Sequence, residues 1–498
     1  MMPAGPSARR LLAIGLLSAA PFGAARAGSL PVDARSIAHT ISYDEMQAFL
    51  ASVNGKGPIT VTNEATTAGG RTVFLVHAAR GPRPTFRAFF YAQQHGDEVS
   101  GKDALLLLIQ EIARAPERLP ADVDLWILPM VNPDGAEAGT RHNGAGADLN
   151  RDHMVLEQPE TQAIHRVVQR VRPHLSVDCH EFARDDEDRQ RHGWVAWPDI
   201  TLDGLNNPLF DAAVITAAAR WVHESAAVES AAGHSFYRYT VGGSPPNQEQ
   251  RHSAPDVDSA MNAVGMYGGL SFIMEAGAWH AAPDPDADLA ARVDASLVLL
   301  RRFLTNTQAH ALDRKIVESA RRRPPPLFVP TNYLWVNPAF AVTQFPVLDA
   351  TTRKPIRIPT ANLMTAVAVK SSRGAPTAYA IAPSAASLFR SLLERHSIPF
   401  VTLTAPRLVT AESCVLLRIE DEVDDFYSRY EGRQIVKCGA AMPQTLAAGA
   451  LWIPFAGEAA TRMALLLDPA ATYGVYQYAR YRALTKIGEA LPVVRVRE

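Results

Sequence analysis

Histidine and glutamate side chains stand at spacings that could hold a metal ion. His95 and Glu98 are three residues apart, and His180 follows in a later polar segment, 177–181. A catalytic zinc ion takes three protein ligands and keeps a fourth position open for water, and two histidines with one glutamate form a recurrent set. These three residues could supply that set. A histidine and a glutamate three apart also occur by chance, usually on a solvated helix turn, so their surroundings must decide.

The elements around the first pair favour a metal site. Residues 85–92 are aromatic and apolar enough for a buried strand, and residues 103–114 repeat apolar side chains at helical spacing. His95 and Glu98 therefore fall in the turn from a strand to a helix.

A second strand is predicted to bring the third candidate ligand to the same place. Residues 160–171 have a helical pattern, and residues 175–179 form a short apolar run that leads into His180. Ligands of open α/β sheets gather beyond the carboxyl ends of parallel strands. A metal ion bridging two strand ends is consistent with this arrangement.

The order and spacing of these segments resemble the zinc carboxypeptidase family, which includes carboxypeptidase A and its bacterial relatives. The resemblance covers about residues 42–307 and also includes the polar segments 132–135 and 148–152. It implies one zinc ion per chain and a peptide substrate with a free C-terminal carboxylate. The matching positions are His95, Glu98, Arg141, Asn150, Arg151, His180 and Glu275.

The resemblance also implies a role for each arginine. Arg141 would polarise the substrate carbonyl and stabilise the oxyanion, whereas Asn150 and Arg151 would hold the substrate carboxylate. Arginine suits both tasks because its planar fork donates two parallel hydrogen bonds and stays charged at any working pH. Taken singly, each arginine would be interpreted as a surface cation.

Glu275 is the candidate catalytic base. Zinc lowers the pKa of its bound water, and a carboxylate is then needed to accept the proton and pass it to the leaving amine. Glu275 ends the apolar run 269–274, which predicts a central strand, and a charge there is costly unless it serves a site. The alternative is a structural ion pair at the end of the strand.

Further polar residues have expected places around the site. Asp148 matches the family's aspartate that orients the first histidine, and Asp178 is predicted to point to the opposite face of its strand. The tyrosine that caps the pocket has no clean match, and Tyr239 is the nearest candidate beside Tyr237. Asp97 stands where animal digestive enzymes carry a substrate-binding arginine, which resembles bacterial members that include amidases acting on cell-wall peptides.

Length and charge restrict the class of protein. The chain has 498 residues, 47% of them hydrophobic, which fits a globular protein of two or three domains. A formal charge of −2 gives no electrostatic footprint for nucleic acid, so no nucleic-acid partner is expected. The basic and proline-rich run 321–326 is interpreted as a solvated linker.

The N-terminus has the pattern of an export signal. Arg9 and Arg10 precede an apolar stretch over 11–22, and small residues at 25–27 form a cleavage site. We therefore expect a signal peptide at 1–27, export to the periplasm or medium, and no stable membrane insertion afterwards. Retention of the apolar stretch as an anchor is the alternative, although it is short for a membrane span.

Beyond the signal, the chain is predicted to divide into three parts. These are a catalytic domain at 28–310, an Arg/Pro-rich linker at 311–330 and a smaller C-terminal α/β domain of unknown role at 331–498. In the last part, strands are predicted at 363–369, 377–381, 400–403 and 450–454, and helices at 385–395 and 458–467. Cys414 and Cys438 could pair, which their spacing does not decide, and Cys179 is interpreted as an ordinary buried residue.

Alternating apolar strands and helical segments predict a mixed, twisted sheet with helices on both faces, and the family resemblance makes it eight strands. The leading functional hypothesis is a zinc metallocarboxypeptidase acting on exported or periplasmic peptides. A zinc amidase or deacylase acting on a cell-wall peptide or an N-acyl amino acid is the second. A catalytically dead binding module is the third, but a binder has no need of a buried base such as Glu275.

Overall fold

The computed structural model describes residues 30–338, 341–420 and 433–498, so the expected signal peptide lies outside the described residues. Its largest element is an eight-stranded sheet in the order β1-β2-β4-β3-β5-β11-β7-β8. The strands are β1 (Ile59–Thr66), β2 (Thr72–Ala79), β3 (Phe86–Ala92), β4 (Val123–Leu128), β5 (Leu175–Ala183), β7 (Ile200–Gly204), β8 (Phe236–Arg238) and β11 (Leu270–Ala278). Strands β4, β3, β5 and β11 run parallel. Strand β1 pairs antiparallel with β2, β2 with β4, and β7 with β11, whereas β8 runs parallel to β7. The predicted mixed sheet of eight strands is confirmed.

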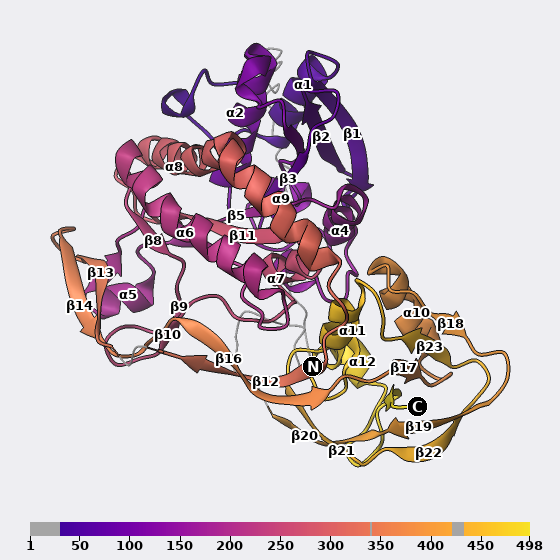
Figure 1. The fold of residues 1–498 in the computed structure, drawn as a ribbon. Helices are drawn as coiled ribbons and strands as arrows, with labels where there is room; N and C mark the ends of the chain where they lie inside the picture. Colours follow the sequence, from indigo (N-terminus) through magenta and orange to yellow (C-terminus); the bar gives the residue numbers. More distant parts are fainter. Residues whose placement is uncertain (1–29, 339–340, 421–432) are drawn as a thin grey trace, which may run out of the picture.

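Helices cover both faces of this sheet (Figure 1). On one face α2, α6 and α8 pack against β3, β5, β7 and β11. On the other face α4 packs against β1 and β3, and α7 packs against β5 and β11. The helices are α1 (Tyr43–Val53), α2 (Ser100–Arg114), α3 (Pro133–Ala138), α4 (Pro159–Val171), α5 (Glu187–Arg191), α6 (Ala212–Ala232), α7 (Ala260–Gly265), α8 (Pro285–Thr305) and α9 (Thr307–Arg321). The central strands are therefore buried on both sides, which explains their continuous apolar sequences.

The C-terminal part contains a second sheet, in the order β18-β23-β17-β24-β19-β22, with all neighbours antiparallel. Its strands are β17 (Ala378–Ile381), β18 (Val401–Thr402), β19 (Arg407–Glu412), β22 (Met442–Leu446), β23 (Leu451–Pro454) and β24 (Val493–Val496). Helices α10 (Ala386–Arg395), α11 (Ala460–Leu467) and α12 (Ala479–Arg482) accompany it. The smaller α/β unit expected in this part of the chain is confirmed.

Short strands link the two parts of the chain. Strand β13 (Thr343–Asp349) pairs with both β14 (Pro355–Thr360) and β6 (Trp194–Ala196), and β15 (Leu363–Met364) pairs with β10 (Gln250–Arg251), which pairs with β9 (Val241–Gly242). Strands β12 (Phe328–Val336) and β16 (Ala366–Gly374) form a ribbon, and a disulfide joins Cys414 to Cys438 across β20 (Cys414–Glu420) and β21 (Arg433–Cys438). One buried hydrophobic cluster continues from the helices on the large sheet to α10 and α11.

The segment expected to be a linker differs from that expectation at its start. Residues up to Arg321 belong to helix α9, and the Arg321 side chain is buried. Its guanidinium donates to three backbone carbonyls, those of Tyr267, Arg172 and Pro173. Since a buried cation needs such partners, Arg321 is a structural residue and not a solvated one.

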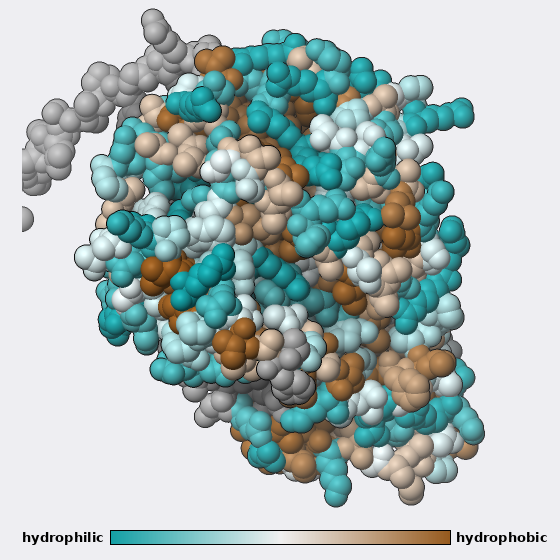
Figure 2. All heavy atoms as spheres, turned by 60° about the vertical axis from the view of Figure 1, so that its left-hand side comes forward, coloured by the Kyte–Doolittle hydropathy of each residue, from teal (hydrophilic) through white to brown (hydrophobic). Residues whose placement is uncertain are grey.

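The surface shows the mixture of polar and apolar residues that the composition implies. Hydrophilic and hydrophobic side chains are interspersed over the face drawn in Figure 2. Among the helices of the described residues, none has the length and apolar character needed to cross a membrane.

Candidate zinc centre

A tight turn presents His95 and Glu98 between β3 and α2. The turn is held from the side by Asn132, whose Nδ2 donates to the carbonyl of Gln94 at 3.0 Å. Gly96 in the same turn lies so close to Gly135 that an added Cβ would stand 2.0 Å from the Gly135 carbonyl carbon. A side chain at position 96 would therefore displace the turn that aims both candidate ligands.

Strand pairing positions the two remaining catalytic candidates. His180 lies in β5 and Glu275 in β11, and the two are register partners in the parallel pairing of these strands. Paired residues of neighbouring parallel strands project to the same face of a sheet. Glu275 therefore lies beside His180, inside its strand and not at the strand end expected from the sequence.

His95, Glu98 and His180 converge on one point. The Nδ1 atoms of His95 and His180 are 3.2 Å apart, and each faces one oxygen of Glu98, at 2.7 Å and 2.8 Å. One ligand atom from each residue lies within 4.8 Å of the others. Both histidines are almost fully buried, which protects such a cluster from bulk water.

The electrostatics of the cluster suit a cation. Burial opposes ionisation of Glu98, but His95 and His180 outweigh it and hold the pKa of this carboxyl below its usual range. Burial likewise opposes a charged His180, but Asp178 and Glu98 raise its pKa well above the usual value. Carboxylates therefore surround two buried imidazoles, and a divalent cation bound there can neutralise the negative charge of these carboxylates.

The donor set fits zinc. Two imidazole nitrogens and a carboxylate are among the ligand sets of catalytic zinc sites. The other ring nitrogen of each histidine also has a carboxylate partner, as ligating histidines usually do: His95 Nε2 lies 3.3 Å from Asp148, and His180 Nε2 lies 2.8 Å from Asp178. The outward partners thus leave both Nδ1 atoms free to bind the ion.

Arg141 lies directly beside these ligands. Its Nε donates to Asp148 at 2.9 Å, and its Nη1 is 3.1 Å from His95 Nδ1 and 3.5 Å from Glu98. Asp148 thus contacts both the histidine that it was expected to orient and the arginine expected to bind substrate oxygen. Burial opposes ionisation of Asp148, but His95 and Arg141 lower its pKa below the usual range.

Asn150 and Arg151 follow Asp148 on a short 3-10 turn, Leu149–Arg151. Asn150 is buried: its Oδ1 accepts from the backbone of Ala260 at 2.8 Å, and its Nδ2 lies 3.3 Å from His180 Nε2. Arg151 is half-buried and donates to the Asn150 carbonyl at 2.6 Å. Asn150 therefore ties this turn to helix α7 and the site, with Arg151 beside it.

Glu275 and Tyr239 form a pair next to the ligands. Burial, with the nearby Glu98 charge, raises the pKa of Glu275 to about 7, although His180 and a hydrogen bond from Tyr239 act in the opposite direction. Burial and the Glu275 charge raise the pKa of Tyr239 well above its usual value. Tyr237 instead packs its ring against Phe345. Of the two tyrosines considered, Tyr239 is the one beside the candidate base.

The expectation for Asp178 is wrong. Asp178 was predicted to face away from the site, but its Oδ2 is 2.8 Å from His180 Nε2 and also accepts from Gln94 Nε2 at 2.8 Å. Residues two apart on a strand share a face, so the strand predicted before His180, extended by one residue, would have indicated this contact. Sequence reasoning missed Gln94 as well.

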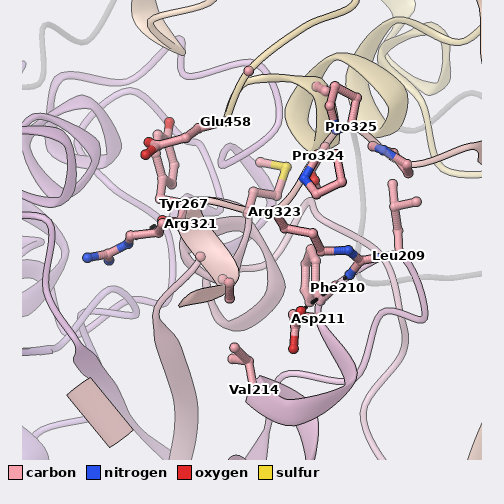
Figure 3. A pocket seen from close by; sticks show the side chains of 18 residues that line it. Leu209, Phe210, Asp211, Val214, Tyr267, Arg321, Arg323, Pro324, Pro325 and Glu458 are labelled. Carbon is pink, nitrogen blue, oxygen red and sulfur yellow. Dashed lines mark hydrogen bonds and ion pairs between the residues drawn. The ribbon is translucent and has the colours of Figure 1, made fainter. Parts of the chain in front are cut away.

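The pocket drawn in Figure 3 lies elsewhere, between α6, the segment after α9 and the start of α11. Tyr267, Arg321 and Glu458 line it together with Phe210. None of the candidate zinc-site residues lines this pocket. This pocket therefore lies at the junction of the two parts of the chain and not at the candidate zinc site.

Comparisons with known proteins agree with the site. Residues 46–185 match the family described as zinc carboxypeptidase. Carboxypeptidase 2 of Trichophyton tonsurans is 24% identical over 195 residues, which is 38% of this chain and 36% of that protein. Carboxypeptidase SOL1 of Arabidopsis thaliana is 31% identical over 138 residues, 23% of this chain and 28% of that protein. The chain thus spans about a third or less of the length of these relatives.

Two solved structures are similar to part of this chain. A metallo-carboxypeptidase from Burkholderia cenocepacia has 21% identity and a TM-score of 0.42, over 54% of this chain and 70% of that chain. A metallo-carboxypeptidase from Pseudomonas aeruginosa in complex with (2-guanidinoethylmercapto)succinic acid has 24% identity and a TM-score of 0.43, with the same coverage.

The family match includes the turn with His95 and Glu98, the Arg141 to Arg151 segment, and His180. The structure brings His95, Glu98 and His180 together beside Glu275, and Arg141 and Asn150 contact the two histidines. Residues 46–185 of this chain therefore match the zinc carboxypeptidase family, and the candidate metal ligands within that match converge in the structure.

Proposed function

We propose that this protein is a zinc-dependent metallocarboxypeptidase that hydrolyses the C-terminal peptide bond of its substrate. The observation that carries the proposal is the convergence of His95, Glu98 and His180 next to the strand partner Glu275. When bound, zinc supplies a Lewis acid that polarises the carbonyl and lowers the pKa of water.

Glu275 carries out the proton transfer, and Tyr239 supports it. Glu275 accepts the proton of the attacking water at its carboxylate and delivers it to the leaving amine. A pKa raised towards neutrality by burial suits a group that must both take up and release a proton. The Tyr239 hydroxyl holds the carboxylate of Glu275 in place through its hydrogen bond.

The arginines recognise the charges of the substrate. Arg141 lies beside His95 and Glu98, where its fork can donate to the oxygen that becomes negative in the transition state. Arg151, with Asn150, is placed to hold the terminal carboxylate of the peptide. This contact would select peptides with a free C-terminus.

One feature supports a second candidate, a zinc amidase or deacylase acting on a cell-wall peptide or an N-acyl amino acid. Asp97 is exposed next to the ligand Glu98, where animal digestive enzymes carry an arginine. An acidic side chain at the rim favours a substrate with an amino group or other positive charge nearby. The export pattern at 1–27 would place either activity outside the cytoplasm.

Release of free amino acids from ordinary peptides, and from a cell-wall tripeptide, tests the proposal. We expect the zinc-loaded protein to trim ordinary peptides, and the same peptides with an amidated C-terminus to be poor substrates. Glu275→Gln should lower kcat by 10²-fold or more, because losing the proton acceptor costs about that much. Arg151→Leu should raise KM mainly for peptides with a free carboxylate.

Asp313→Asn is a matched control for the charge change, because Asp313 is buried in α9 against Trp221 and Arg220. It should leave turnover unchanged. Cleavage of the cell-wall tripeptide alone would favour the amidase. Zinc binding without turnover of either substrate would contradict both enzymatic candidates.

A further inference from the structure

A buried chain of hydrogen bonds leads away from the zinc ligand His180. Its first links are the contacts of Asp178, which accepts from His180 Nε2 and from Gln94 Nε2, each at 2.8 Å. The other end of the Gln94 carboxamide, Oε1, lies 2.7 Å from Nε2 of His153. Asp178, Gln94 and His153 have no exposed surface, so these polar groups depend on one another for partners.

The chain continues through two more rings. His153 Nδ1 lies 3.1 Å from Nε2 of His165, and His165 Nδ1 lies 3.0 Å from the hydroxyl of Tyr267. Both histidines are at most 1% exposed. Burial lowers the pKa of His153 to about 3 and that of His165 well below its usual value, so both rings are neutral.

Neutral rings give the chain one direction. Each neutral imidazole has one N–H donor and one acceptor nitrogen. The Asp178 carboxylate only accepts, so Gln94 must turn its NH₂ towards Asp178 and its oxygen towards His153. His153 then donates from Nε2 and accepts at Nδ1, His165 does the same, and the Tyr267 hydroxyl donates to His165. Every donor therefore points towards the carboxylate that orients His180.

The far end of the chain is held by the C-terminal part of the protein. His396, at the C-terminus of α10, donates from Nε2 to the carbonyl of Met154 at 2.8 Å, and its Nδ1 lies 3.3 Å from the Tyr267 hydroxyl. Burial lowers the pKa of His396 to about 3, so this ring is also neutral, and its Nδ1 is an acceptor. It competes with His165 Nδ1 for the one hydrogen of the Tyr267 hydroxyl, and the shorter contact, 3.0 Å against 3.3 Å, favours His165. The guanidinium of Arg462 in α11 lies 4.5 Å from the centre of the Tyr267 ring.

A further contact fixes Tyr267 from the side. Gln169 Nε2 donates to the Tyr267 hydroxyl at 3.2 Å and to the Arg395 carbonyl of α10 at 2.6 Å. Figure 3 shows Tyr267 near Glu458, where the C-terminal part meets the large sheet. The hydroxyl that ends the chain is therefore positioned jointly by α4, α10 and α11.

We propose that His153 and His165 are positioning residues of the zinc centre, and that the C-terminal part holds Tyr267, the last donor of their hydrogen-bond chain, in place. They act through Gln94 and Asp178 on the orientation of His180. The inference deepens the proposed function, on which it rests for the identity of the ion. It also gives the C-terminal part a role, which is to keep one metal ligand in its binding orientation.

The test measures the zinc dissociation constant by competition with a chromogenic chelator. Partners behind a metal ligand typically contribute 10- to 100-fold in affinity. We expect His165→Leu to weaken zinc binding about 10-fold, and His165→Gln, which keeps a donor and an acceptor, to recover most of it. Tyr267→Phe removes only the terminal hydroxyl and should weaken binding several-fold. In peptide assays at saturating zinc, these variants should lower kcat more than they raise KM.

His310→Leu is the matched control, because His310 is equally buried and hydrogen-bonded, to the Phe303 carbonyl at 2.8 Å, but lies outside the chain. It should lower thermal stability without changing zinc affinity. Wild-type affinity in folded His165→Leu and Tyr267→Phe, or an equal loss in His310→Leu, would overturn the proposal. If His165→Leu does not fold, Tyr267→Phe decides alone.

The outcomes separate this inference from the proposed function. A wild-type protein that binds zinc but cleaves no peptide contradicts the proposed function, while the affinity differences still support or overturn the positioning chain. A wild-type protein that binds no zinc would overturn both.

Discussion

Asp178 shows how much a single carboxylate can matter to a metal ligand. It lies two residues before His180 on β5 and faces Nε2 of that ring, which leaves Nδ1 directed to Glu98 and His95. The carboxylate therefore fixes both the ring orientation and the tautomer of His180. Asp148 faces Nε2 of His95 from a different segment, at the longer distance of 3.3 Å.

We predict that Asp178→Asn weakens zinc affinity about 10- to 100-fold, because a carboxamide lacks the charge that supports a ligating imidazole. The measurement is chelator competition, with circular dichroism to verify folding. Asp313→Asn removes another fully buried carboxylate and should bind zinc as wild type does. Equal affinity of Asp178→Asn and wild type would show that His180 is oriented by other contacts.

The buried carboxyl group of Glu229, in helix α6, should make the stability of the protein depend on pH. It is fully buried, and neither of its carboxylate oxygens has a hydrogen-bond partner in the described residues. Burial, with the charges of Asp294 and Asp199, raises the pKa of Glu229 to about 9. The folded protein thus holds this carboxyl protonated, whereas in the unfolded chain it ionises above a pH of about 4.3.

The direction of this pH dependence follows from the difference in proton binding between the folded and unfolded states. The contribution of Glu229 to the free energy of unfolding is complete below its unfolded pKa and is lost as pH rises towards the folded pKa. Glu229→Gln cannot ionise, so its stability relative to wild type should rise by up to about 1.4 kcal/mol per pH unit over this window. We expect a higher Tm than wild type at pH 8 and little difference at pH 4.5.

Exposed Glu117→Gln is the control for this comparison and should follow wild type at both values. A Tm difference independent of pH would mean that Glu229 is ionised in the folded protein.

At the scale of elements, the sequence predicted those with long or strongly patterned runs. The strand expected at 85–92 is β3, and the helices expected at 103–114 and 160–171 are α2 and α4, within a few residues. In the C-terminal part, β17, α10, β23 and α11 also lie where they were predicted. These elements bury a continuous apolar run or one apolar face, which is the signal that a pattern can carry.

Other elements could not be predicted from the sequence, because tertiary contacts and not local patterns define them. Strand β7 lies in a segment rich in Asp, Arg and Trp, whose composition does not indicate a strand, yet it pairs antiparallel with β11 in the large sheet. The links β6 to β13 and β10 to β15 join residues more than a hundred positions apart, and no local signal predicts such pairing. The same reason explains His153 and His165, whose roles depend on distant partners.

Gly96 provides a prediction at the level of the ligand turn. Gly96→Ala would place a methyl carbon 2.0 Å from the Gly135 carbonyl carbon, far closer than van der Waals contact, so β3 and α3 must separate or the turn must shift. We expect zinc affinity to fall at least 10-fold, measured by chelator competition. Gly439→Ala is the control for adding a methyl group, because its backbone is not in the left-handed region and an added Cβ would come no closer than 3.9 Å to the nearest described atom. An unchanged zinc affinity in Gly96→Ala would show that the turn can relax without moving its ligands.

For the whole molecule, the question is whether the two parts of the chain are independent. The sequence predicted a catalytic domain at 28–310, a linker, and a separate domain at 331–498. The structure has strands that pair across this division, a hydrophobic cluster that spans it, and Arg321 bonded to carbonyls of the large-sheet region. Tyr267, the last donor of the hydrogen-bond chain that leads to His180, contacts His396 and Arg462 across the same junction.

These contacts predict the behaviour of a chain cut after residue 330. Without residues 331–498, the buried faces that meet α10 and α11 would be exposed to water, at a cost of about 25 cal/mol per Å² of apolar surface. Strand β6 would also lose its partner β13, and the Tyr267 hydroxyl would lose its contact with His396. We therefore expect the shortened protein to be less soluble, to have a Tm lower by 10 °C or more, and to bind zinc more weakly than the full chain. A shortened protein with the Tm and zinc affinity of the full chain would instead mean that the large sheet and its helices hold the metal ligands without help. The positioning role of the C-terminal part would then have to be abandoned, whereas the proposed peptidase chemistry at Glu275 would stand.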